Sequence, residues 1–149
     1  MVDVVREIEI GRPRPEVAGY ACDPDNARNW YRNIKDVEWR SEPPLAVGSK
    51  LAFVAEFLGR RLEYTYEVRE LVPCERLRMS TDRGPFFMET TYTWSDTATG
   101  GTHMTLRNCG QPAGFARLVE PIMQLAMRRA NRKDLELLKD LIESKPRTA

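Results

Sequence analysis

Apolar and polar residues alternate along most of this chain, which is the pattern of strands that bury one face. The first such segment covers residues 2–10, where the even-numbered positions from Val2 to Ile10 are mainly apolar and the acids occupy odd positions. The same period of two recurs between Asp36 and Asn108, interrupted by proline-rich and glycine-rich turns. It predicts further strands over 37–40, 51–57, 61–69, 76–81, 87–94 and 103–108, joined as an antiparallel meander.

Two short helices are expected between the first and second strands. Pro15 and Glu16 start the first one, because a proline fits the first helical turn and an acid is favoured at the positive end of the helix. Asp23 caps the second, which has Pro24 at its first position. This second helix carries Trp30 and leads directly into the meander.

The last quarter of the chain has apolar residues at helical spacing. It predicts one long helix from about Phe115 to about Glu143, with Pro121 either kinking it or marking where a short preceding turn meets it. The apolar stripe of this helix comprises Phe115, Leu118, Val119, Ile122, Met123, Ala126, Met127, Ala130, Leu137, Leu138, Leu141 and Ile142.

These elements predict an α+β fold in the order β-α-α-β6-α. A sheet of about seven strands with one apolar face and a helix with one apolar stripe must bury each other. We therefore expect a strongly curved antiparallel sheet wrapped around the long C-terminal helix, with an internal cavity between them. A length of 149 residues indicates a single domain over 1–149, of which 144–149 form a disordered tail.

The cavity would be lined by the inward parity of each strand and by the facing side of the helix. Aromatic and methionine side chains dominate these positions, as in sites that bind apolar ligands, although the same residues also suit plain core packing. Trp30 either anchors the short helices to the sheet or flanks the mouth of the cavity. The predicted ligand-binding residues are Trp30, Phe53, Tyr64, Tyr66, Met79, Met88, Tyr92, Met104, Asn108, Phe115, Met123 and Met127.

Composition and charge exclude several classes of protein. Hydrophobic residues make up 42% and charged residues 30% of the chain, and the net charge is +1, which provides no general attraction to nucleic acid. No run of apolar residues is long enough for membrane insertion, and the N-terminus lacks the features of a secretory signal. We therefore expect a cytoplasmic protein that is a monomer or a homodimer and binds neither nucleic acid nor membrane interior.

The sequence contains few groups for cofactor or nucleophilic chemistry. It has a single histidine, His103, on an outward position, and no glycine-rich phosphate loop or GxSxG motif. The three cysteines, Cys22, Cys74 and Cys109, are far apart and are expected to be free thiols. We expect no metal and no cofactor. The carboxylates Glu63, Glu67 and Glu89 are outward and suited to cross-strand ion pairs.

A basic run on the long helix has two interpretations. Arg128, Arg129, Arg132 and Lys133 form either a solvated face or a docking patch for an acidic carrier protein or a phosphate-bearing ligand. Asp134 lies nearer the apolar stripe, where Arg129 or Arg132 could reach it; these arginines could also pair with Glu136.

Short motifs in the right order resemble those of the START-like (SRPBCC) helix-grip superfamily, and more narrowly its bacterial polyketide cyclase/dehydrase-type members. They cover nearly the whole chain. They comprise Ile10–Val17, Tyr20, Asp23-Pro24, Asn26 and Trp30-Tyr31; Glu70–Pro73 with Arg76-Leu77; Tyr92–Trp94 with Gly101-Thr102; and Asp134-Leu135, Leu138-Lys139 and Leu141–Glu143. The resemblance implies the helix-grip fold and a cavity for a hydrophobic small molecule.

Three functions remain open at this point. The first is non-enzymatic binding of a hydrophobic or aromatic molecule such as a lipid, an isoprenoid or a polyketide. The second is a polyketide aromatase/cyclase that acts on a poly-β-keto chain held by an acyl carrier protein, with Tyr64, Tyr66, Tyr92 and Asn108 as candidate proton donors or orienting groups. The third is a protein-interaction subunit, suggested by the adjacent Phe86 and Phe87, which cannot both face inward on one strand.

Overall fold

Seven antiparallel strands form one sheet in the order β1-β7-β6-β5-β4-β3-β2 in a computed structural model that describes residues 1–57, 59–83, 87–111 and 118–146. The first strand pairs with the last, and the other strands follow one another as a meander. This arrangement confirms the predicted α+β class and the predicted strand order. The strands are β1 Val2–Ile10, β2 Ile34–Trp39, β3 Lys50–Phe57, β4 Arg60–Val72, β5 Arg76–Arg83, β6 Met88–Asp96 and β7 Thr102–Gly110.

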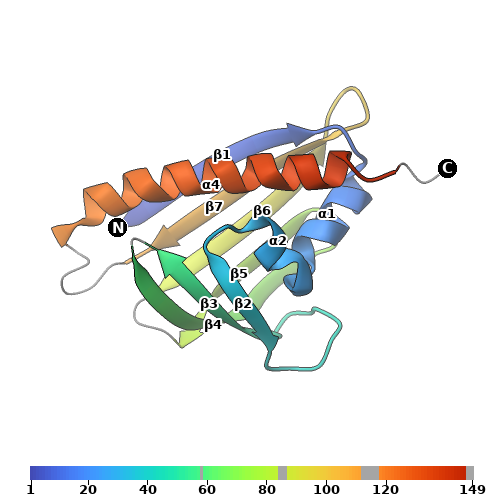
Figure 1. The fold of residues 1–149 in the computed structure, drawn as a ribbon. Helices are drawn as coiled ribbons and strands as arrows, with labels where there is room; N and C mark the ends of the chain where they lie inside the picture. Colours follow the sequence, from blue (N-terminus) through green and yellow to red (C-terminus); the bar gives the residue numbers. More distant parts are fainter. Residues whose placement is uncertain (58, 84–86, 112–117, 147–149) are drawn as a thin grey trace.

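The helices lie on one face of this sheet (Figure 1). The short ones are α1 Arg14–Cys22, η1 Pro24–Asn26 and α2 Ala27–Trp30, and the long one is α4 Glu120–Glu143. Asp23 caps η1 as expected, because its carboxylate accepts a hydrogen bond of 3.0 Å from the Asp25 N–H. α4 crosses the sheet along β1 and β7, while α1 and α2 sit near its C-terminal end (Figure 1).

Two apolar clusters hold α4 to the sheet, one toward each end of the helix. The larger cluster includes Leu135, Leu138 and Ile142, all nearly inaccessible to solvent, packed with the inward side chains of the strands and with α1 and α2. The smaller cluster joins Val2 and Val4 of β1 to Met123. Since burial of each aliphatic side chain contributes about 1.5–3 kcal/mol, these contacts keep the helix in place.

Polar contacts fix the C-terminal end of α4. Arg12 is only 5% exposed, and its guanidinium donates to the carbonyls of Glu143, at 2.7 Å, and Lys145. The Glu143 carboxylate accepts from the Gly11 N–H at 2.7 Å and from Lys139 Nζ at 2.8 Å. These bonds satisfy helix-end carbonyls that have no partner within the helix, and they tie α4 to the turn after β1.

The first turns of α4 differ from the predicted apolar stripe. Leu118 and Ile122 are 79% and 62% exposed, because Val119 and Met123 face β1 at this end of the helix. Pro121 does not kink the helix: it lies in the first turn of α4, where a missing N–H costs no hydrogen bond. The expected helical start at Phe115 lies outside the described residues.

The structure also places several residues that were predicted to lie on the surface and part of the predicted tail. Phe87 is 49% exposed, while its neighbour Phe86 lies outside the described residues. His103 lies on the outward face, 3.1 Å from the Glu7 carboxylate, and Arg78 Nη1 lies 3.3 Å from Glu89 across β5 and β6. Of the predicted disordered tail, residues 144–146 are described and residues 147–149 are not.

Truncation of the α4 anchor tests this account of the fold. We expect Leu138→Ala to lower the free energy of unfolding by about 3 kcal/mol, because it leaves a cavity in the larger cluster. Leu125→Ala on the same helix is the matched control, since Leu125 is 62% exposed and its loss should change stability by less than about 0.5 kcal/mol. Urea denaturation measures both values, and equal effects would contradict the packing described.

Candidate functional site

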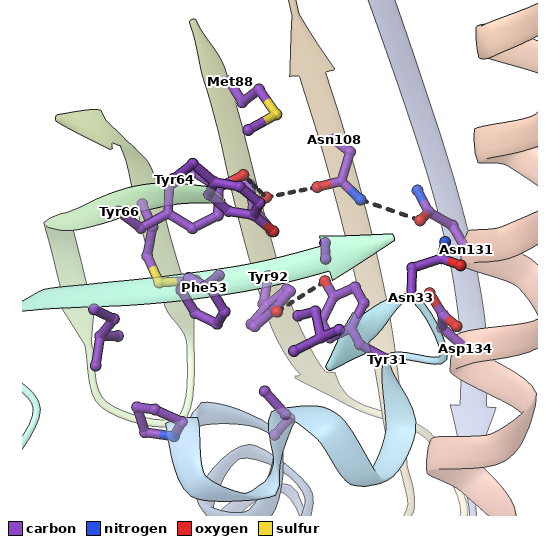
Figure 2. A pocket seen from close by; sticks show the side chains of 18 of the residues that line it. Tyr31, Asn33, Phe53, Tyr64, Tyr66, Met88, Tyr92, Asn108, Asn131 and Asp134 are labelled. Carbon is purple, nitrogen blue, oxygen red and sulfur yellow. Dashed lines mark hydrogen bonds between the residues drawn. The ribbon is translucent and has the colours of Figure 1, made fainter. Parts of the chain in front are cut away.

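A pocket of about 130 Å³ lies between the sheet and α4 and is bordered by members of both apolar clusters (Figure 2). Its wall comes from the short helices and the turn after α2, the loop at Leu45, strands β2 to β7 and the part of α4 from Met123 to Asp134. The alternation of each strand aims every second side chain at this space, which is why residues far apart in sequence meet there.

An aromatic group forms the apolar side of the pocket. Phe53 of β3 is directly opposite Tyr64 of β4, with ring centroids 5.6 Å apart and nearly parallel rings. Tyr66 stands edge-on to both, at 5.6 Å from Phe53 and 5.1 Å from Tyr64. Such pairs add about 0.5–1.5 kcal/mol beyond their buried area, so this wall is well ordered and apolar.

A chain of hydrogen bonds crosses the pocket from the sheet to α4. Asn108 Nδ2 donates to Asn131 Oδ1 at 3.1 Å, and Thr90 Oγ1 donates to Asn108 Oδ1 at 2.6 Å. Because the Thr90 proton is used there, Tyr66 Oη donates to Thr90 at 2.8 Å. Figure 2 shows this chain as a row of dashed lines. At its end, Asn131 Nδ2 is buried and has no hydrogen-bond partner in the described part of the chain.

A second pair of hydroxyls lies where β6 meets the end of α2. Tyr92 Oη donates to Tyr31 Oη at 2.8 Å, which joins β6 to the end of α2. Trp30 packs against both tyrosines, with ring centroids at 4.1 Å from Tyr31 and 5.7 Å from Tyr92. Trp30 thus fits the anchoring alternative and supports the tyrosine pair from its outer side.

Burial keeps the phenols and the nearby thiol protonated. It raises the pKa values of Tyr31, Tyr64, Tyr66 and Tyr92 above the ordinary tyrosine range. It also raises the pKa of the Cys22 thiol to about 12. At neutral pH these groups cannot serve as a ready base or thiolate nucleophile. The protons of Tyr66 and Tyr92 are already donated to Thr90 and Tyr31, whereas no described residue accepts the proton of Tyr64.

Asp134 is the buried carboxyl group of the pocket. It is 1% exposed, and one carboxylate oxygen accepts a hydrogen bond of 3.1 Å from the Arg32 backbone N–H. Burial raises its pKa to about 7, an effect larger than the lowering by the Arg32 N–H. Of the two alternatives for the arginines, the pairing with Glu136 is confirmed for Arg132, which lies 3.9 Å from Glu136 on the exposed face of α4. Asp134 faces the pocket and forms an ion pair with neither Arg129 nor Arg132.

The structure brings together most of the residues predicted to bind a ligand. Trp30 of α2 and Met104 of β7 are buried in the larger cluster and are not among the described residues that line the pocket. For Met104 the reason is that strand parity sets the face of a side chain but not its distance from the cavity. Phe115 lies outside the described residues. The predicted residues on the wall are Phe53, Tyr64, Tyr66, Met79, Met88, Tyr92, Asn108, Met123 and Met127.

Several polar wall residues were absent from the predicted set. Asn33 follows α2 in a turn that strand alternation does not cover, whereas Thr90 shares the parity of Tyr92. Asn131 and Asp134 lie one and two turns after Met127 on the same side of α4, so helical spacing alone could have placed them at the pocket. Asn131 was assigned no role from the sequence, and Asp134 was interpreted as an ion-pair candidate near the apolar stripe.

No helix among the described residues combines the length and apolar character that crossing a membrane requires. Nor do they contain a group of three or more histidine, cysteine, aspartate or glutamate residues arranged to hold a metal ion.

A model for the family "Polyketide cyclase / dehydrase and lipid transport" matches residues 1–143. The chain belongs to this family. The match confirms the resemblance to START-like cyclase/dehydrase proteins that the short motifs indicated. No curated protein sequence matches the chain.

Solved structures share the helix-grip fold of this family member at low sequence identity. A protein of Thermus thermophilus is 19% identical with a TM-score of 0.83, covering 95% of this chain and 97% of that one. A START superfamily protein from Mycobacterium smegmatis is 13% identical with a TM-score of 0.78 and the same coverage. The Zhui aromatase/cyclase from Streptomyces sp. R1128 is 15% identical with a TM-score of 0.80, covering 98% of this chain and 96% of that one.

The buried carboxyl group predicts an unusual dependence of stability on pH. The pKa of Asp134 is higher in the folded protein, at about 7, than the ordinary value of 3.8, so its ionisation destabilises the fold as pH rises through this window. We expect Asp134→Asn to be more stable than the parent, with an advantage that grows by about 2–3 kcal/mol between about pH 5 and about pH 8.

Thermal or urea denaturation at both pH values measures this difference. Asp140→Asn is the matched control, because Asp140 is an exposed carboxylate on the same helix and its removal should give no such trend. A stability advantage of Asp134→Asn that is constant with pH would show that Asp134 ionises as an exposed group does.

Proposed function

We propose that this family member binds a hydrophobic or aromatic small molecule in the pocket between the sheet and α4. The observation that carries the proposal is a pocket walled mainly by apolar side chains, with an aromatic group on the sheet. Ligand sites in proteins have this composition, with a few polar groups that orient the bound molecule. The family description, which includes lipid transport, supports the same function.

The volume of the pocket limits the size of the ligand that fits without side-chain movement. An apolar cavity of about 150 Å³ accommodates a single benzene ring, so the space of about 130 Å³ fits one ring or a short branched chain. Four methionines of the described residues line the space and can change rotamer at low cost, which would admit a longer molecule. These methionines are Met79, Met88, Met123 and Met127.

A fluorescent dye tests the binding proposal. We expect N-phenyl-1-naphthylamine, a neutral aromatic dye, to bind with one saturable site and an emission increase. Ala130→Phe places a ring into the pocket from α4 and should weaken this binding at least tenfold, because the ring occupies the ligand space.

Arg129→Phe is the matched control for this variant. It adds the same ring at the neighbouring position, which is exposed, and should bind the dye as the parent does. Circular dichroism confirms that both variants are folded. Unchanged binding by Ala130→Phe, or no saturable binding by the parent, would refute the proposal.

A polyketide aromatase/cyclase is the second candidate function. The fold shared with the aromatase/cyclase Zhui supports it, and so does the protonated phenol of Tyr64, which could donate to a keto oxygen. Tyr64 is the strongest donor candidate, because its hydroxyl makes no hydrogen bond to other described residues and the group faces the pocket. The exposed basic run from Arg128 to Lys133 would then receive an acyl carrier protein.

Substitution of this phenol separates the two functions. If the protein is a cyclase, Tyr64→Phe should lower the rate of cyclisation of a carrier-bound poly-β-keto chain, or redirect its product, by about tenfold or more. Dye binding should change little, since the ring remains. Product analysis by liquid chromatography measures the outcome, and cyclisation that is unaltered would remove Tyr64 from the mechanism.

A further inference from the structure

We propose that Asn131 and Asp134 form a binding site for the hydroxyl group of an otherwise apolar ligand, such as a phenol or a sterically similar alcohol. This inference rests on the proposed binding function and names the chemical class of the ligand. It is carried by two buried polar side chains that face one pocket and complement one another as donor and acceptor.

Asn131 supplies an unused donor. The residue is 3% exposed, and its carbonyl oxygen is occupied by Asn108 Nδ2 at 3.1 Å. Its amide nitrogen is buried and has no partner in the part of the chain that the structure describes. Buried donors in folded proteins are nearly always paired, and among the described residues this amide N–H remains available to an acceptor on a ligand.

Asp134 supplies the acceptor, three residues further along the same face of α4. One of its oxygens takes the Arg32 N–H, and no other described residue donates to the carboxylate. A carboxylate accepts several hydrogen bonds, so capacity remains on the side of the pocket. Figure 2 shows Asn131 and Asp134 on the α4 side of the pocket, with Asn33 between them in this view and Tyr31 nearby.

The pairing of a donor with an acceptor selects among ligand groups. A hydroxyl oxygen can accept from Asn131 while its proton is donated to Asp134. An ether could use Asn131 alone, an ammonium group would leave the Asn131 N–H unpaired, and a ligand carboxylate would be repelled by ionised Asp134. The remaining wall is apolar and aromatic, which suits the hydrocarbon part of the same molecule.

The groups that face Asp134 keep the same charge near neutral pH, so Asp134 is the group whose charge changes there. Arg32 contributes a constant positive charge from the turn after α2, and Tyr31 and Tyr92 stay neutral because burial raises their pKa values. Of the other titratable groups on the wall, burial raises the pKa of Cys22 to about 12 and Asp23 is exposed. Since the pKa of Asp134 is about 7, its acceptor strength should rise between about pH 6 and about pH 8.

Three naphthalene compounds test this assignment. We expect the protein at about pH 8 to bind 2-naphthol about tenfold more tightly than 2-methoxynaphthalene, and the ether more tightly than naphthalene. The preference for 2-naphthol over the ether should shrink toward about threefold at about pH 6. Isothermal titration calorimetry or fluorescence titration gives the dissociation constants.

Variants assign each hydrogen bond to its residue. Asp134→Asn should reduce the preference for 2-naphthol over the ether to about threefold at both pH values, because the ionised acceptor is gone. Asn131→Leu should remove the preference for the ether over naphthalene. Asp140→Asn, on the exposed face of α4, should match the parent at every pH.

The outcomes separate this inference from the function on which it rests. Equal binding of all three compounds by the parent, or a preference for 2-naphthol that Asp134→Asn leaves unchanged with the same pH dependence, overturns the hydroxyl site alone. No binding of any of the three overturns the proposed function as well. If Asn131→Leu does not fold, the comparison of Asp134→Asn with Asp140→Asn still decides the question.

Discussion

The contact between α4 and the sheet is the interaction on which the rest of the structure depends. The sheet presents one apolar face, and α4 covers it with apolar clusters toward each of its ends. Arg12 and Glu143 fix one end through helix-end hydrogen bonds, and β1 holds the other through Val2 and Val4. The middle of α4 is joined to β7 by the bond from Asn108 to Asn131, and this part of the helix lines the pocket.

Polar residues at the middle of α4 explain why apolar side chains do not fill the space between this part of the helix and the sheet. Asn131 and Asp134 occupy positions where a packed helix would carry leucine or isoleucine, and burial of a carboxyl group opposes ionisation strongly enough to move its pKa to about 7. A buried group with a displaced pKa is unfavourable for stability, and such groups concentrate at functional sites. The same residues that weaken the core therefore give the pocket its polar side.

Much of the fold could be predicted because alternation and helical spacing are local properties of the sequence. The strands, the short helices and the inward direction of Tyr66, Met79 and Tyr92 all follow from these periods. These periods do not give the distance of a side chain from the cavity, so Trp30 of α2 and Met104 of β7 were assigned to the pocket although they lie in the core. For Asp134, pairing with Arg129 or Arg132 was one of two alternatives, because a local pattern does not show that the adjacent face of α4 borders a cavity.

Native mass spectrometry of the protein purified from its own organism, followed by solvent extraction and identification of the released molecule, tests the central claim most directly. The account predicts a defined apolar compound that carries a hydroxyl group, bound at one copy per chain. Protein that binds no such compound and also shows no uptake from an extract of its own cells would contradict a role in carrying hydrophobic molecules.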